Sequence, residues 1–455
     1  MRAWGSGAVL FLLCVVIYSA NGRVVGGGDC WAIRYIPVSI IREGNLDLNE
    51  YPEITFQVWD WTRDRRFRVP LQPVLTGIFA VPLYLAASGL GVSFTPWNLA
   101  FLGKLASTLY TAFSAVVLLA LLRRRLSRAR AYLLILAYAF GTCVWTVSSQ
   151  DLWQHGFSHL LISLGLYCLF SAESRPGLAG LSGFFLSLAA LSRGMNVPLA
   201  AAGFACVLIR FRSQTVRFLL WCLPGVAYYL SYNLYYLGSP GNPIVAYALG
   251  FFHPAGMPGA LAGLLFSPGR GMLFFSPFLL LALPGAYWGC REPSPRRVLY
   301  RCLSAGTVFY LVFLSSWYMW WGGHCYGYRM LVDLVPVLLV LMVPAVKLLD
   351  RRFLRRIFLF LVLWSVLLQA AGALYYCDRW NGRRRVDKHP ERLWWIADGQ
   401  LEYMLRRAAE AGWRVEKKVQ LPRGHRDRAH LVPPGARCPG EPPVPGDSLG
   451  SPGGV

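Results

Sequence analysis

The sequence predicts an all-α, polytopic membrane protein, because of its composition, the length of its apolar runs and the placement of its charges. Of the 455 residues, 55% are hydrophobic, and apolar runs of about 14 to 25 residues recur almost from end to end; about 20 such residues suffice to cross a bilayer. The net charge is +23, but the basic residues stand in short clusters between apolar runs. That placement is typical of membrane topology signals and argues against nucleic acid as a partner.

Eleven apolar segments are expected to span the lipid bilayer, although several have only about 15 residues and must include flanking residues to do so. The segments are 7–20, 98–122, 131–149, 157–171, 177–191, 196–210, 216–236, 272–289, 299–314, 331–347 and 356–376. With the N-terminus inside, five connections fall on the cytoplasmic face, and together they hold 18 Arg or Lys residues against three acidic ones. This excess agrees with the positive-inside rule.

Two segments near the N-terminus have alternative interpretations. The run 70–89 is long enough to span, but counting it would move the arginine-rich connection at 123–130 to the outer face, and it contains three prolines. It is therefore interpreted as re-entrant or interfacial. The first segment, 7–20, is short and follows a basic start, so a cleaved signal peptide is the alternative to a spanning helix there.

On this map the polar stretches that could carry chemistry all lie on the outer face, whereas the cytoplasmic connections offer only charge. They are the first outer loop, 21–69, and the stretches 150–156, 192–196, 266–271 and 320–329. Three of the later outer connections each carry one arginine, namely Arg193, Arg270 and Arg329. Because arginine there opposes the orientation signal and is costly near lipid, each is expected to have an anionic partner.

Five motifs follow one another in a recognisable order. They are "NGRVVGGGDCWAIRYIPVSIIREGNLDLNEYPE", "QDLWQHG", "LLFSPGRGMLFFSPFLLLALPG", "WWGGHCYGYRMLVDLVP" and "RVDKHPERLWWIADGQ". From about residue 8 to residue 402 the chain resembles bacterial and archaeal integral membrane proteins similar to the C-type glycosyltransferases (the GT-C fold). That fold includes the dolichyl-phosphate-mannose protein mannosyltransferases and the aminoarabinose transferases of lipid A. The resemblance implies a multi-pass enzyme of the cell membrane that moves a sugar from a polyprenyl-phosphate donor to a protein, lipid or polysaccharide acceptor at the outer face.

The resemblance also implies that an acidic residue early in the first outer loop is the general base, and the matching residue is Asp29. It follows three glycines, which let the backbone turn tightly and approach a ligand closely. Cys30 stands where a hydroxyl residue is more usual in the family, and this leaves the local hydrogen bonding open. Arg34, in the same loop, is expected to bind substrate. The alternative for Asp29 is an ordinary turn aspartate after a glycine run.

The stretch "QDLWQHG" has three interpretations. Asp151, His155 and His159 stand at i, i+4 and i+8 and could share a helix face that holds a divalent metal, but Gly156 is expected to interrupt the helix. The second interpretation, which we favour and which needs no cofactor, places Asp151 and His155 in the substrate pocket, with the Trp153 ring against a sugar or lipid chain. In the third, Asp151 and the glutamine before His155 only cap a helix.

The departing polyprenyl phosphate needs fixed positive charge beside it. Arg270 is the first choice, because it lies between two glycines just before an apolar segment, where backbone N–H groups and the helix dipole add to the guanidinium. Arg329, Arg193 and Lys104 are further candidates. For each arginine the alternative is a structural ion pair or a side chain that extends to the interface.

The sequence divides into three parts: 1–376 is the predicted transmembrane domain, 377–420 a small charged appendage on the outer face, and 421–455 a Pro- and Gly-rich tail expected to be disordered. Two other classes of function stay open. A secondary transporter or lipid flippase would show paired halves with polar groups near the midplane, and a non-catalytic scaffold would need no polar cluster.

Overall fold

Helices account for almost all of the regular secondary structure in the part of the chain that the structure describes. The computed structural model describes residues 2–52, 54, 58–59 and 67–415, so the tail predicted to be disordered, 421–455, and the last residues of the appendage lie outside the described residues. Within these ranges the strands form one short antiparallel pair, β1 (Val58–Trp59) and β2 (Val69–Pro70), and an isolated bridge joins Phe252 and Trp317. The prediction of an all-α protein is confirmed.

Four helical stretches of the described chain are long and apolar enough to cross a membrane. They are α6 (Pro96–Leu122), α16 (Arg297–Ser315), the stretch Arg329–Asp350 and α18 (Arg352–Tyr375). Shorter apolar helices accompany them at Gly5–Ser19, Leu75–Gly89, Gly177–Ser192, Gly194–Arg210, Pro254–Phe266 and Pro277–Cys290. The length and composition of these helices indicate a protein embedded in a membrane.

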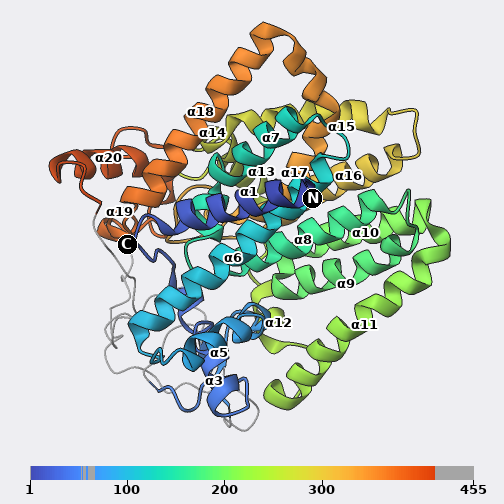
Figure 1. The fold of residues 1–455 in the computed structure, drawn as a ribbon. Coiled ribbons are helices and arrows are strands. Elements are labelled where there is room, and N and C mark those ends of the chain that lie inside the picture. The colour runs from blue at the N-terminus through green and yellow to red at the C-terminus, as the bar shows by residue number, and fades with distance from the viewer. Residues whose placement is uncertain (1, 53, 55–57, 60–66, 416–455) are drawn as a thin grey trace, which may run out of the picture.

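The first half of the chain forms a layer of neighbouring helices (Figure 1). Helix α1 (Arg2–Ser19) lies along α6, and α8 packs against both α6 and α9. The other helices of this half are α7 (Arg128–Phe140), α8 (Gln154–Ser171), α9 (Gly177–Ser192), α10 (Val197–Arg210) and α11 (Thr215–Tyr232). Most predicted segments here match one helix, but 131–149 does not.

Two predicted segments are broken into pieces. After α7 the chain turns at Gly141 and resumes as one π-helical turn, Val144–Ser148. Segment 272–289 contains α14 (Met272–Phe275), a 3₁₀ turn that begins at Pro277, and α15 (Ala282–Cys290). Proline has no N–H group to continue the hydrogen-bond ladder, so α14 ends before it.

The first outer loop, 21–69, and the run 70–89 that follows it fold into short helices that pack on α6. They are α2 (Gly28–Trp31), α3 (Ile36–Arg42), α4 (Leu75–Ile78) and α5 (Val81–Gly89), and α3 contacts both α4 and α5. Figure 1 shows α3 and α5 together at the lower end of the molecule. At about 1.5 Å per residue, the nine residues of α5 reach less than half of the roughly 30 Å of a bilayer core. The interfacial interpretation of 70–89 stays a prediction.

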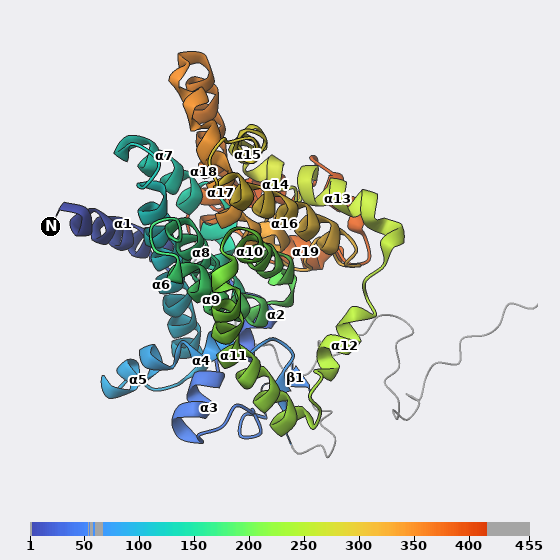
Figure 2. The same ribbon diagram turned by 90° about the vertical axis from the view of Figure 1, so that its right-hand side faces the viewer.

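The second half of the chain adds helices outside the predicted spans. The connection between segments 216–236 and 272–289 contains α12 (Pro243–Leu249) and α13 (Met257–Phe266), and the appendage contains α19 (Arg379–Arg383) and α20 (Gln400–Glu410). At the centre lies α17 (Val335–Met342), whose eight residues are all buried among α7, α8, α15 and α16 (Figure 2). The 3₁₀ turn Arg329–Leu334 directly precedes it, and this turn carries the polar centre described next.

Candidate functional site

The glycine run before Asp29 lies directly against the turn that precedes α8. A Cβ atom on Gly26 would overlap the carboxylate of Asp151, and one on Gly27 would come within 2.6 Å of the Trp153 ring. Only a residue without a side chain allows the loop backbone to come this close to the Asp151 and Trp153 side chains. The first outer loop and the stretch "QDLWQHG" therefore form one surface, and Asp29, in the first turn of α2, stands at its edge.

Asp151 forms a buried ion pair with Arg34, with side chains 0% and 2% exposed. The Nε atom of Arg34 donates to Asp151 Oδ1 at 2.9 Å, and its Nη2 atom donates to the other carboxylate oxygen. Asp151 Oδ1 also accepts the N–H of Leu152 at 2.7 Å. The pair thus ties the first loop to the turn before α8, while the predicted role of both residues in substrate binding stays a prediction. The capping alternative is wrong, because Trp153 is the N-cap of α8 and no side chain caps that helix.

Asp29 forms an ion pair with Arg329, 300 residues later in the chain. The guanidinium of Arg329 also lies 3.9 Å from the centre of the Trp153 ring, a cation–π contact. The side chains of Asp29 and Arg329 keep 19% and 13% of their surface exposed. The carboxylate predicted to be the general base and a predicted phosphate-binding arginine are therefore in contact, and solvent reaches both.

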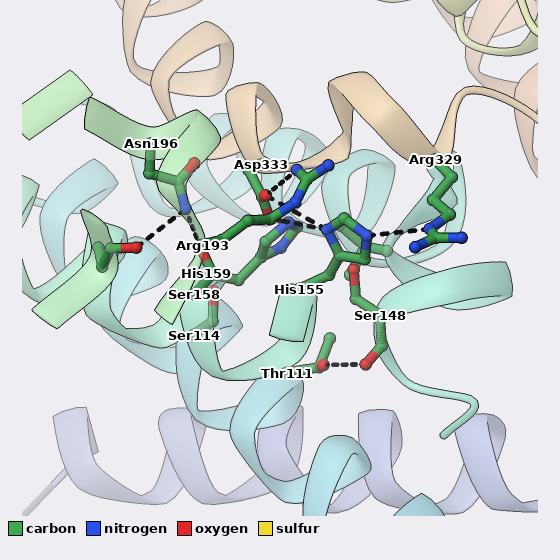
Figure 3. A network of polar contacts seen from close by, with 12 residues as sticks. Thr111, Ser114, Ser148, His155, Ser158, His159, Arg193, Asn196, Arg329 and Asp333 are labelled. Atoms are coloured by element: carbon green, nitrogen blue, oxygen red, sulfur yellow. Dashed lines mark hydrogen bonds and ion pairs between the residues drawn. The ribbon is translucent and has the colours of Figure 1, made fainter. Parts of the chain in front are cut away.

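Behind this pair lies a buried centre around Asp333 (Figure 3). The Nδ1 atom of His155 lies 3.2 Å from both carboxylate oxygens of Asp333, and Arg193 pairs with the same carboxylate. The Nε atom of Arg329 donates to His155 Nε2 at 3.4 Å. The Nε2 atom of His159 approaches Asp333 Oδ1 to 3.5 Å. One fully buried carboxylate thus joins side chains from α8, the 3₁₀ turn before α17, and the connection between α9 and α10.

The polar network continues into the helical layer. His159 Nδ1 lies 3.0 Å from the hydroxyl of Tyr138, which lies 2.8 Å from the hydroxyl of Ser114 on α6. Ser114 in turn lies 2.9 Å from Ser163. Each of these groups is buried, and their mutual hydrogen bonds satisfy polar atoms that would otherwise be costly between apolar helices.

The side chains of Asp151, His155 and His159 do not come together as the metal interpretation expects. Asp151 turns to Arg34, while the two histidines face Asp333 instead. Gly156 does not interrupt α8, which runs through it. A Cβ atom at this position would lie 2.7 Å from the carbonyl oxygen of Ser148, so glycine allows the helix to start against this turn. Among the described residues, no group of three or more His, Cys, Asp or Glu is arranged to hold a metal.

Arg270 is enclosed by protein oxygens. Its side chain is 1% exposed, and all five N–H donors are occupied. The acceptors are the carbonyls of Gly269, Trp321 and Gly323 and the side-chain oxygens of Gln400 and Asn381, at 2.8 to 3.1 Å. Its hydrogen-bond partners within the described residues are neutral. The expectation of an anionic partner is therefore wrong for Arg270, but it is confirmed for Arg193 and Arg329. With no donor left over, Arg270 is placed to fasten the appendage rather than to bind phosphate.

Lys104 is also buried and lies behind the first loop. Its ammonium group donates to Asn21 Oδ1, to the carbonyl of Arg23 and, at 3.2 Å, to Gln150 Oε1. Asn21 donates to the same glutamine oxygen at 2.7 Å. Lys104 therefore fastens the start of the first loop to the turn before α8, and it lies outside the Asp29–Arg329 contact.

Asp333 is the residue of this centre that the sequence interpretation missed. It was visible as a single acid at the start of the apolar segment 331–347, and an ionisable residue in such a segment is by default a functional candidate. Tyr138 gave no comparable signal, because a tyrosine in an apolar run is ordinary. The polar positions of α6 were readable in principle, since Lys104, Thr111 and Ser114 recur at helical spacing.

The sequence matches no protein-family model, and no curated protein matches it at a significant level. The likeness to the C-type glycosyltransferases therefore stays a prediction that rests on the five motifs.

Proposed function

We propose that the protein is a membrane glycosyltransferase that moves a sugar from a polyprenyl-phosphate donor to an acceptor, with Asp29 as the general base. The observation that carries this proposal is the contact between Asp29 and Arg329 at the exposed edge of a buried polar centre. Sugar transfer from a lipid phosphate requires a base for the acceptor and a cation for the leaving phosphate, close to each other. The two side chains supply these groups from distant parts of the chain.

In the proposed reaction Asp29 accepts the proton of the acceptor hydroxyl while the acceptor oxygen bonds to the anomeric carbon of the sugar. The bond between that carbon and the phosphate oxygen breaks, and its electron pair leaves with the phosphate. Arg329 neutralises the charge that develops there. A single displacement of this kind inverts the configuration at the anomeric carbon. The Trp153 ring contacts the Arg329 guanidinium and holds this cation in place for the phosphate.

The proposal includes a C-type architecture in the cell membrane, with eleven spans and the site on the outer face. Two observations support it. Every predicted span coincides with helical structure, continuous or broken, and the first outer loop contacts the turn before α8, as a common face requires.

A deletion strain of the source organism, complemented with variants, tests the proposal. Envelope glycans are profiled after complementation with the wild type, Asp29→Asn and Asp350→Asn. Asp350 is the matched control, because it also pairs with an arginine, Arg130, but at an exposed position. We expect Asp29→Asn to cut transfer by about 10²- to 10⁴-fold at normal protein level, whereas Asp350→Asn restores the glycan. An unchanged glycan with Asp29→Asn contradicts the proposal.

A secondary transporter or lipid flippase is the second candidate, and one observation favours it. Asp333, His155 and His159 form an ionisable cluster inside the helical bundle, all 0% exposed, and such clusters are typical of proton and ion pathways. In that case Asp333→Asn and His159→Gln would abolish uptake or lipid translocation while leaving the glycan composition unchanged.

A further inference from the structure

The Arg329 guanidinium is held by protein on every side except one. Its flat face lies on the Trp153 ring, its Nε atom donates to His155, and its Nη1 atom donates to the carbonyl of Gly322 at 3.3 Å. The remaining edge, at Nη2, faces Asp29. An arginine fixed in this way cannot follow a ligand, so a ligand must come to that edge.

The exposed edge of Arg329 has the geometry of an anion-binding site. A guanidinium presents paired donors that match the oxygens of a carboxylate or a phosphate. Here the Asp29 carboxylate occupies this edge, and it is the more exposed partner of the pair. Asp333, by contrast, is fully buried beneath Arg193 and His155, so a ligand reaches Asp29 first.

The proposed function cannot operate while this pair is intact. Arg329 must contact the phosphate of the donor, whereas Asp29 must turn to the acceptor hydroxyl, and neither side chain is available for this while the two bind each other. On the basis of the proposed function, we infer that the donor phosphate displaces Asp29 from Arg329, so that the base becomes free only when the donor is bound. The resting ion pair is then an autoinhibitory contact.

The exchange needs only a small movement. The backbone before Asp29 is fixed, because Gly26 and Gly27 pack tightly on Asp151 and Trp153, but the short Asp29 side chain can rotate about its own two torsions. The charges also fit this exchange, because the incoming phosphate replaces the negative charge that leaves Arg329 and the guanidinium is never left unpaired.

Binding of an isoprenyl phosphate without a sugar separates this exchange from catalysis. The probe is decaprenyl phosphate, measured on the full-length protein in nanodiscs by microscale thermophoresis. Asp29→Asn and Asp29→Ser remove the competing charge, so we expect each to bind the probe roughly tenfold more tightly than the wild type. Arg329→Ala should bind it at least about tenfold more weakly. Asp350→Asn, the matched exposed carboxylate, should bind like the wild type.

The two Asp29 variants decide between the outcomes. If the wild type binds the probe but both Asp29 variants bind it equally or more weakly, the displacement is refuted and the proposed function survives. If neither the wild type nor the Asp29 variants bind the probe, both the displacement and the proposed function fail.

Discussion

The Nδ1 atom of His155 lies 3.2 Å from both carboxylate oxygens of Asp333, and this contact decides how the imidazole is used. Because a carboxylate only accepts, Nδ1 carries the hydrogen, and Nε2 is left to accept from Arg329. Arg193 closes the other side of the same carboxylate. Asp333 thereby orients His155, and His155 orients the arginine that faces Asp29.

Replacing Asp333 should destabilise the protein strongly. In Asp333→Asn the guanidinium of Arg193, whose side chain is 11% exposed, loses its fully buried counter-charge, and breaking a buried pair in this way typically costs about 3–5 kcal/mol. We expect a clear fall in the thermal unfolding midpoint of the purified protein in detergent. Asp350→Asn, which breaks an exposed pair with Arg130, should unfold like the wild type. Equal midpoints for both variants would show that Asp333 is not the electrostatic centre of the bundle.

The glycine run makes a separate prediction about packing. A Cβ atom on Gly26 would overlap the Asp151 carboxylate, so Gly26→Ala should displace the buried pair of Asp151 with Arg34 and lower the unfolding midpoint. Gly259→Ala is the matched control, because a Cβ atom at that position of α13 meets no atom within 4 Å and alanine favours a helix. A Gly26→Ala protein as stable as the control would mean that the loop and the turn are not in contact.

Much of the fold could be predicted from the sequence, because apolar runs of helical length are its dominant feature. The starts of α6 and α18, within about four residues of the predicted ones, follow from where the apolar runs meet polar or basic residues. The breaks at Gly141 and Pro277 could not be placed in the same way. Glycine and proline are tolerated within membrane helices when neighbours satisfy the backbone, so their effect depends on tertiary contacts that periodicity does not reveal.

The site was predictable in its members but not in its pairings. Asp29 was chosen because of the resemblance to the glycosyltransferases, and His155 and Arg329 because they stand at predicted segment ends. The structure brings the three together. Which carboxylate pairs with which arginine depends on the three-dimensional path of the chain. Arg270 shows the limit of motif reasoning, since its position between two glycines indicated an anion site, whereas neutral oxygens of residues 51 to 130 positions later surround it.

Arg270 should therefore matter for docking of the appendage. Arg270→Ala would leave the buried oxygens of Gln400 and Asn381 without their donor, and each such loss costs about 1–3 kcal/mol. We expect limited proteolysis to cut between α18 and α20 faster than in the wild type. Lysine should rescue only in part, since it has three donors instead of five. Arg406→Ala, at an exposed position 50% accessible, is the control and should be cut at the wild-type rate.

The membrane arrangement can be tested with reporter fusions. Fusions after Arg125 and after Arg217 should report a cytoplasmic location, and a fusion after Arg379 should report an external one, as the excess of basic residues in the predicted inner connections requires. The contact of Gly26 with Asp151 adds a constraint, because both must lie on one side. An external signal at Arg125 would show that 70–89 crosses the membrane. The contact between the first loop and the turn before α8 would then need another explanation.

His324 should make stability depend on pH in the alkaline range. Its Nδ1 atom lies 3.0 Å from Asp378 and its Nε2 atom 3.5 Å from Asp387. Burial opposes the charge of the imidazole, but the hydrogen bonds and negative charge of the two carboxylates outweigh it and raise the pKa of His324 to about 9. In the unfolded chain a histidine has a pKa of about 6.5. Between these values the folded protein holds a proton that the unfolded chain has released.

The stabilisation by this imidazolium is complete below about pH 6.5 and is lost as the pH rises through about 9. We expect the unfolding midpoint of the wild type to fall across this window by more than that of His324→Gln, which has no proton to lose. His389→Gln is the control, because His389 pairs with a single carboxylate, Glu391, which is more exposed than Asp378 and Asp387. This variant should keep the pH slope of the wild type. Parallel pH profiles for the wild type and His324→Gln would show that the histidine is not charged between Asp378 and Asp387.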